Sequence, residues 1–154
     1  MRTKKHLNLP ITEFTAKVNS ALAELGSELK ITGVTAEEHN HVRFAKINNN
    51  LVYTLACVPK RRIIKNLTLI GTGTGSIQSG VNIFYAIFAT IMAASDMVKD
   101  ETTKAAVVLV NGTKPSAVEI NGIKYKLMRT QGVGAWLTVE AADAKEERIN
   151  EKKL

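Results

Sequence analysis

Cysteine is nearly absent from the sequence, and this limits the kinds of site that the protein can contain. The single cysteine, Cys57, excludes an internal disulfide and a zinc site built from several thiolates. It lies in the apolar run of residues 51–58, so we interpret it as a small buried side chain. The sequence also lacks a Gly-x-Ser-x-Gly elbow and a pair of carboxylates in apolar surroundings. It therefore leans against an enzyme, and we expect neither a metal nor a cofactor.

Aromatic residues are scarce throughout the chain, and acidic residues are missing from one long block. Phe, Trp and Tyr make up 5% of the residues, which gives little support for stacking on single-stranded nucleic acid. No Asp or Glu occurs from His39 to Ser95, and the net charge of the chain is +7. This block contains a predicted basic patch, made of Arg43, Lys46, Lys60, Arg61, Arg62 and Lys65. The patch favours anionic partners, and an ordinary solvated surface is the alternative interpretation.

The N-terminal residues lack the long apolar run of a signal peptide. The default expectation is a cytoplasmic protein, and a mature exported domain whose signal has been removed is the alternative. A chain of 154 residues, 45% of them hydrophobic, fits one domain with a substantial core. We expect residues 1–154 to form this domain, with mobile tails at residues 1–7 and 142–154.

The sequence is organised around residues 67–94, where an apolar run leads through a glycine-rich stretch into a long hydrophobic segment. We predict a strand, a loop, and a helix over residues 80–95 that is buried on nearly every side. Helical spacing places bulky residues on one face, namely Ile83, Phe84, Ile87, Phe88, Ile91 and Met92. It places small residues on the opposite face, namely Ala86, Ala89, Thr90, Ala93 and Ala94.

The small face of this helix would let another backbone approach closely, from a second helix or from a partner subunit. The candidate interface for self-association consists of Ala86, Ala89, Thr90 and Ala93. A membrane span is the rival interpretation, but spanning needs roughly 20 apolar residues. Because the run begins after Gly80 and contains Asn82, we expect a buried helix and no membrane span.

The glycine-rich stretch is a candidate anion site. A strand that leads through glycines into a helix N-terminus exposes backbone N–H groups and the positive end of the helix dipole. The candidate residues are Gly73, Gly75, Ser76, Ser79 and Gly80. The stretch lacks the Lys-Ser/Thr of a Walker A loop. A flexible crossover loop without a ligand is the alternative.

Two further patterns precede this region. Residues 8–26 predict an amphipathic helix, with a proline suited to its first turn and a glycine just after its last. Residues 29–71 predict a four-stranded antiparallel meander. In the strand of residues 41–47 we expect one apolar face and one basic face, the basic face carrying Arg43 and Lys46.

The region after the central helix contains a second group of strands. Residues 101–110 are ambiguous between helix and strand, with a weak preference for helix. Residues 116–140 predict three strands, the first two joined by Asn121-Gly122, a strong hairpin signal. We expect Trp136, in the last of these strands, to be a core or edge anchor.

Strands and helices that occur in separate blocks indicate an α+β fold. We expect an antiparallel meander sheet with an N-terminal amphipathic helix and a buried central helix, followed by a C-terminal hairpin or three-strand unit. The order of elements resembles that of small helix-plus-sheet adaptor domains such as secretion chaperones, which tend to be acidic where this chain is basic.

The leading hypothesis is a non-enzymatic binding or adaptor domain that recognises a protein or another anionic partner and self-associates. The alternative is a nucleic-acid-binding protein that uses the basic region of residues 43–65. A third hypothesis is the binding of a small phosphorylated ligand at residues 71–80.

Overall fold

The computed structural model of the protein describes residues 7–35, 41–74, 76–95, 99–111, 116–130 and 134–142. Within these residues it contains three helices and an eight-stranded antiparallel sheet, which confirms the predicted α+β fold with a meander-like sheet. In chain order the elements are β1 (Leu9–Pro10), α1 (Ile11–Glu24), β2 (Gly33–Val34), β3 (Val42–Asn48), β4 (Leu51–Cys57), β5 (Ile63–Thr72), α2 (Ile77–Ser95), α3 (Lys99–Asn111), β6 (Ser116–Ile120), β7 (Ile123–Thr130) and β8 (Gly134–Ala141).

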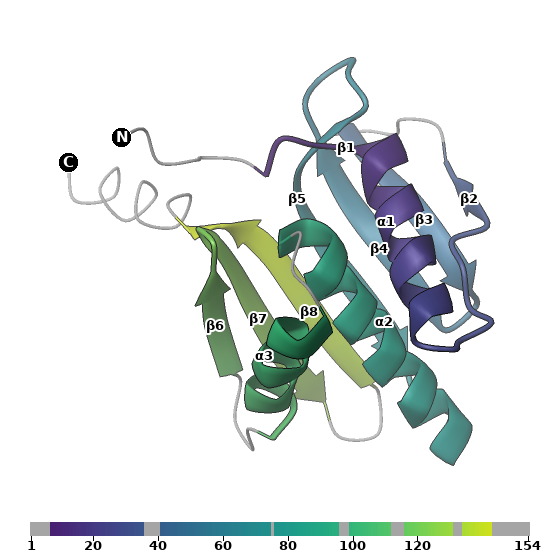
Figure 1. Cartoon of the computed structure of the whole chain (residues 1–154). Coiled ribbons are helices and arrows are strands. Elements are labelled where there is room, and N and C mark those ends of the chain that lie inside the picture. The colour runs from purple at the N-terminus through teal and green to yellow at the C-terminus, as the bar shows by residue number, and fades with distance from the viewer. Residues whose placement is uncertain are drawn as a thin grey trace.

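The sheet consists of two runs of neighbouring strands that meet in its middle. The strand order is β2-β3-β4-β5-β8-β7-β6, and the short β1 pairs with β5 beside this path. The two runs meet where β5 pairs with β8. All three helices lie on one face of the sheet, and no helix of the described residues covers the other face (Figure 1).

The helix α1 ends in a Schellman motif around Gly26. Gly26 has a φ of 79°, and its N–H donates to the carbonyl oxygen of Ala23, while the N–H of Ser27 donates to that of Leu22. At its N-terminal end the helix is shorter than the predicted residues 8–26. Pro10 is the N-cap residue: its ψ of 138° makes it extended, it pairs with Ile63 of β5, and the helix therefore begins at Ile11.

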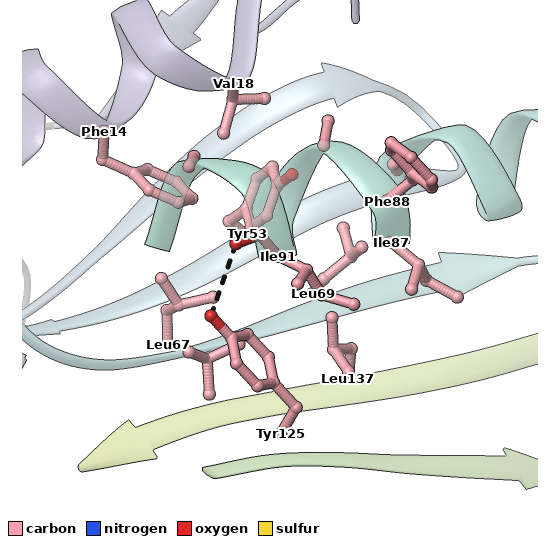
Figure 2. Packing of buried hydrophobic residues seen from close by; sticks show 14 of the residues in the cluster. Phe14, Val18, Tyr53, Leu67, Leu69, Ile87, Phe88, Ile91, Tyr125 and Leu137 are labelled. Carbon is pink, nitrogen blue, oxygen red and sulfur yellow. Dashed lines mark hydrogen bonds between the residues drawn. The ribbon is translucent and has the colours of Figure 1, made fainter. Parts of the chain in front are cut away.

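The core lies between the helices and the covered face of the sheet. The ring of Phe14 from α1 packs edge-on against Tyr53 from β4, with 5.2 Å between ring centroids. Figure 2 shows the side chains that meet around this pair, which include Val18, Leu67, Leu69, Ile87, Phe88, Ile91 and Leu137. The contacts join α1, α2 and strands from both halves of the sheet, so the described residues share one core.

Two buried tyrosines hold α2 on the sheet. The hydroxyl of Tyr53 lies 2.7 Å from Oγ1 of Thr90. The hydroxyl of Tyr125 shares a hydrogen bond with Ser95 and donates to the carbonyl oxygen of Ile91 at 3.4 Å, the bond dashed in Figure 2. Burial raises the pKa of both phenols well above their usual value, so both hydroxyls stay protonated.

The helix α2 is enclosed along its C-terminal half only. From Ala86 to Ser95 every side chain is buried or half-buried, whereas Ile77 is 89% exposed and Val81 and Phe84 are each 36% exposed. The first turns extend past the sheet (Figure 1), so the prediction of burial along residues 80–95 is wrong for this end. The helix α2 is long and apolar enough to cross a membrane by length and composition alone. Core helices of globular proteins meet the same criterion, so this finding is weak evidence for a membrane span.

The region after α2 follows the predictions closely. Residues 101–110, ambiguous in the sequence, belong to the helix α3. Asn121 and Gly122 have φ values of 52° and 79° and join β6 to β7, the conformation of a type I′ hairpin turn. β8 completes the predicted three-strand unit.

Of the four strands predicted over residues 29–71, the first is reduced to the two residues of β2.

Candidate functional site

The uncovered face of the sheet displays three large apolar side chains. Phe44 is 40% exposed, Met128 43% and Trp136 48%. Each alternates along its strand with buried core residues, so each points away from the helices. Trp136 was expected to be a core or edge anchor, and it lies instead near the centre of an open surface.

Four apolar side chains form a continuous row across this face. The strand register places Val52 beside Ile70 and Ile70 beside Trp136. It places Met128 on the other side of Trp136. Because neighbouring strands are about 4.8 Å apart, the row spans about 14 Å. We call these four residues the apolar stripe, and Lys46 of β3 continues it at one end.

A second row, rich in threonine, runs beside the apolar stripe. Thr54, Thr68 and Thr138 are in register on three adjacent strands. Phe44 lies at one end of this row and Lys126 at the other. In the next row Lys124 lies between two glutamates in register, whereas the register partners of Lys46 and Lys126 are not acidic. The uncovered face therefore offers apolar, hydroxyl and ammonium groups together.

The predicted basic face of β3 does not exist as we placed it. Arg43 shares a strand face with the buried Ala45 and points to the covered side of the sheet, where its Nη1 donates to the carbonyl oxygen of Thr35 at 3.4 Å. Lys46 points to the uncovered face. Because residues of odd and even number point to opposite faces of a strand, the two cations cannot share one face, and the prediction is wrong.

The other residues of the predicted basic patch lie far from Lys46. The turn between β4 and β5 carries exposed Lys60, Arg61 and Arg62, and half-buried Lys65 follows in β5. Lys46 lies opposite Val52, near the start of β4, so the length of this strand places it about 20 Å from the turn. The six residues therefore do not form one surface.

The glycine-rich connection leads from β5 into α2, as predicted. Ser76 caps the helix, because its Oγ accepts the N–H of Ser79 at 3.1 Å, and the Oγ of Ser79 accepts the N–H of Thr74 at 3.2 Å. The N–H group of Ser79, which a bound anion would use, is thus already bonded within the chain. Gly73 and Gly80 lie on either side of this cap, and Gly75 lies outside the described residues. The anion site stays a prediction.

The four candidate interface residues are buried inside the single chain. Ala86, Ala89 and Thr90 are 0% exposed, and Ala93 is 2% exposed. The helix α1 lies alongside α2 (Figure 1), and Thr90 bonds to Tyr53. The close approach predicted for the small face is made within the chain, by α1 and the sheet, so these residues are not available to a second subunit.

A pocket of about 250 Å³ lies on the covered side of the sheet, beside the first turns of α2. Its walls are formed by side chains of α2 and of the strands β7 and β8, namely Ile83, Phe84, Ile87, Leu127, Arg129 and Ala135. Gly80 and Gly134 complete the lining. Among the described residues that line it, Arg129 alone carries a charge.

Small residues in the sheet create the room for this end of α2. A Cβ added to Gly71 would lie 3.0 Å from Cγ1 of Ile83, so glycine lets the helix lie close to β5. A Cβ added to Gly134 would lie 1.9 Å from the carbonyl oxygen of Gly71. Gly134 also has a φ of 144°, which side chains rarely allow. Gly134 is therefore required by close approach, whereas a Cβ at Gly71 would need only a small shift of the Ile83 and Leu51 side chains.

Reasoning from the sequence missed both the apolar stripe and the pocket. Alternation of apolar and polar residues in the strands was visible, but it does not tell which face the helices cover. The pocket depends on the pairing of β5 with β8, which brings Gly71 and Gly134 together from distant parts of the chain. Neither feature has a local sequence signal.

No group of three or more His, Cys, Asp or Glu side chains among the described residues could hold a metal ion. Comparison of the chain with protein-family models, with curated protein sequences and with solved structures finds no match.

Proposed function

We propose that the protein is a non-enzymatic binding domain that contacts an acidic protein partner through the uncovered face of its sheet. The observation that carries this proposal is the apolar stripe, in which Trp136 is 48% exposed. Contiguous exposed apolar surface with a polar surround is typical of interaction sites. Aromatic residues and methionine are enriched at the cores of such interfaces.

The charges around the stripe favour an acidic partner over a second copy of the chain. The ammonium groups of Lys46 and Lys126 lie in the rows of the stripe and the threonines, and neither has an acidic register partner. The chain as a whole carries a net charge of +7. A second copy would bring further lysines to the same surface, whereas an acidic partner would pair with those already there.

The single tryptophan of the chain makes this surface directly observable. We expect the emission of Trp136 to shift to the blue when the stripe is covered by a synthetic peptide in which glutamate and leucine alternate. Because Trp136→Phe would remove the fluorescence signal, the peptide affinity of all variants is measured by calorimetry. Met128→Ser should weaken binding by about thirtyfold, as at an interface hot spot.

The matched control is Val108→Ser on α3, where the side chain is 59% exposed on the helical side. This change should leave affinity within about twofold, since surface substitutions away from a contact have small effects. Equal loss in both variants, or emission that the peptide leaves unchanged, would overturn the proposal. Sedimentation over the same concentrations separates self-association, which would change the mass without peptide.

Binding of single-stranded nucleic acid is the second candidate function. Phe44 and Trp136 share the uncovered face with Lys46 and Lys126, and exposed aromatics beside lysines on a sheet suit stacked bases and phosphates. This function predicts that affinity for an oligonucleotide falls steeply with salt and that Lys126→Gln lowers the salt slope by about one. An oligonucleotide that alters Trp136 emission where the acidic peptide does not would favour it over the first proposal.

A further inference from the structure

The pocket beside α2 is chemically unlike the uncovered face and lies on the opposite side of the sheet. We propose that it binds a small carboxylate whose hydrocarbon body has about ten carbons, with decanoate as the simplest example. Because the two sites lie on opposite sides of the sheet, a ligand can bind the pocket whether or not a partner binds the uncovered face, and each proposal is tested by its own experiment.

The lining of the pocket selects a hydrocarbon. Ile83, Phe84 and Ile87 lie on one face of α2, and Leu127 and Ala135 lie on the strands β7 and β8. Apart from one arginine, every described residue that lines the pocket is apolar or glycine. A polar ligand body would lose its hydrogen bonds to water here and gain none in return.

The volume of the pocket sets the size of that hydrocarbon. An apolar cavity of about 150 Å³ accommodates benzene, with its six carbons. In proportion, about 250 Å³ accommodates about ten carbons. A chain of four carbons would leave much of the wall uncovered, and a chain of sixteen would have to project into water.

Arg129 selects the head group. It is the one charged residue among the described residues that line the pocket, and it is exposed to solvent. A guanidinium matches the two oxygens of a carboxylate with two parallel N–H donors. A single cation above an apolar body fits a monoanion better than a neutral alcohol or a dianion.

The ligand class is tested by calorimetric titration of the full chain with straight-chain carboxylates of four to sixteen carbons, kept below micelle-forming concentrations. Affinity should rise about fourfold for each added methylene, the factor expected when one more CH₂ leaves water. The rise should stop near ten carbons. A series that does not bind at millimolar concentration, or that keeps tightening to sixteen carbons, would overturn the proposal.

Two variants with the same change of charge test the role of Arg129. Arg129→Gln should weaken decanoate binding about tenfold or more and leave decanol unchanged, since only the carboxylate loses a charged donor. Arg61→Gln makes the same substitution in the exposed turn between β4 and β5, outside the lining of the pocket, and should leave decanoate binding within about twofold. Equal weakening by both variants would show a non-specific effect of net charge and refute the assignment.

A third variant tests the pocket itself without endangering the fold. Gly80 lines the pocket in the first turn of α2, and an added Cβ there would meet no atom within 4 Å. Gly80→Leu places a side chain in the pocket and also raises helix propensity, so the variant should fold at least as well as the natural chain. It should lose decanoate binding. Retained affinity in a folded Gly80→Leu protein would show that the ligand binds elsewhere.

Discussion

Replacing Ala89 by leucine distinguishes a core role for the small face of α2 from an interface role. Ala89 is 0% exposed in the single chain. Added methyl groups in such a packed site force neighbouring side chains from their preferred positions and cost about 1–3 kcal/mol. For a domain of this size about 1 kcal/mol lowers Tm by about 2–4 °C, so we expect Ala89→Leu to lower it by about 2–12 °C.

The control for this experiment is Ala23→Leu, an exposed alanine in another helix, α1. It should change the free energy of unfolding by no more than about 0.5 kcal/mol. Urea unfolding followed by circular dichroism measures both variants. If Ala89→Leu left the unfolding midpoint unchanged but reduced the mass of an assembly, the small face would be an interface and the burial argument would fail.

Two further perturbations address the centre of the sheet and the buried tyrosines. Gly134→Ala should lower the free energy of unfolding by at least about 1–3 kcal/mol, because Gly134 has a φ of 144° and lies against a carbonyl oxygen. The control Gly33→Ala, where a Cβ meets no atom within 4 Å, should leave stability nearly unchanged. Equal shifts of Tm in the two variants would contradict this. Tyr53 and Tyr125 have pKa values raised by burial, so the unfolded chain releases their protons first as pH rises past about 10. The contribution of the two tyrosines to the free energy of unfolding is therefore fully present below pH 10. Above pH 10 it should fall by up to about 1.4 kcal/mol per pH unit for each tyrosine. In urea unfolding, a variant that carries both Tyr53→Phe and Tyr125→Phe should show a shallower fall with pH.

Elements with local causes were predictable from the sequence. Gly26 ends α1 because it reaches a positive φ, and Asn121-Gly122 forms a hairpin for the same reason. The strand-to-helix connection before α2 followed from its glycines and from the long apolar run behind it. Each of these signals acts within a few residues, so the fold class could be derived without knowing which distant segments meet.

The candidate sites could not be derived in the same way. The position of Trp136 depends on which face of the sheet the helices cover, and the sequence pattern of β8 is the same for either choice. Arg43 and Lys46 were assigned to one face although their spacing of three residues places them on opposite faces of a strand. Ala89 is fully buried in α2, a helix that packs against α1 from a distant part of the chain, and the sequence does not show this contact.

The pairing of β5 with β8 closes the longest loop of any strand pair in the sheet. Apart from the short β1, which pairs with the distant β5, each half of the sheet is built from strands that follow one another, so their pairs close short loops. The central pair joins residues about 60 to 70 positions apart, and closing such a loop costs roughly 4 kcal/mol on a logarithmic estimate. The two halves are thus built mainly from short-range strand pairs, and the pairing of β5 with β8 joins them into one sheet.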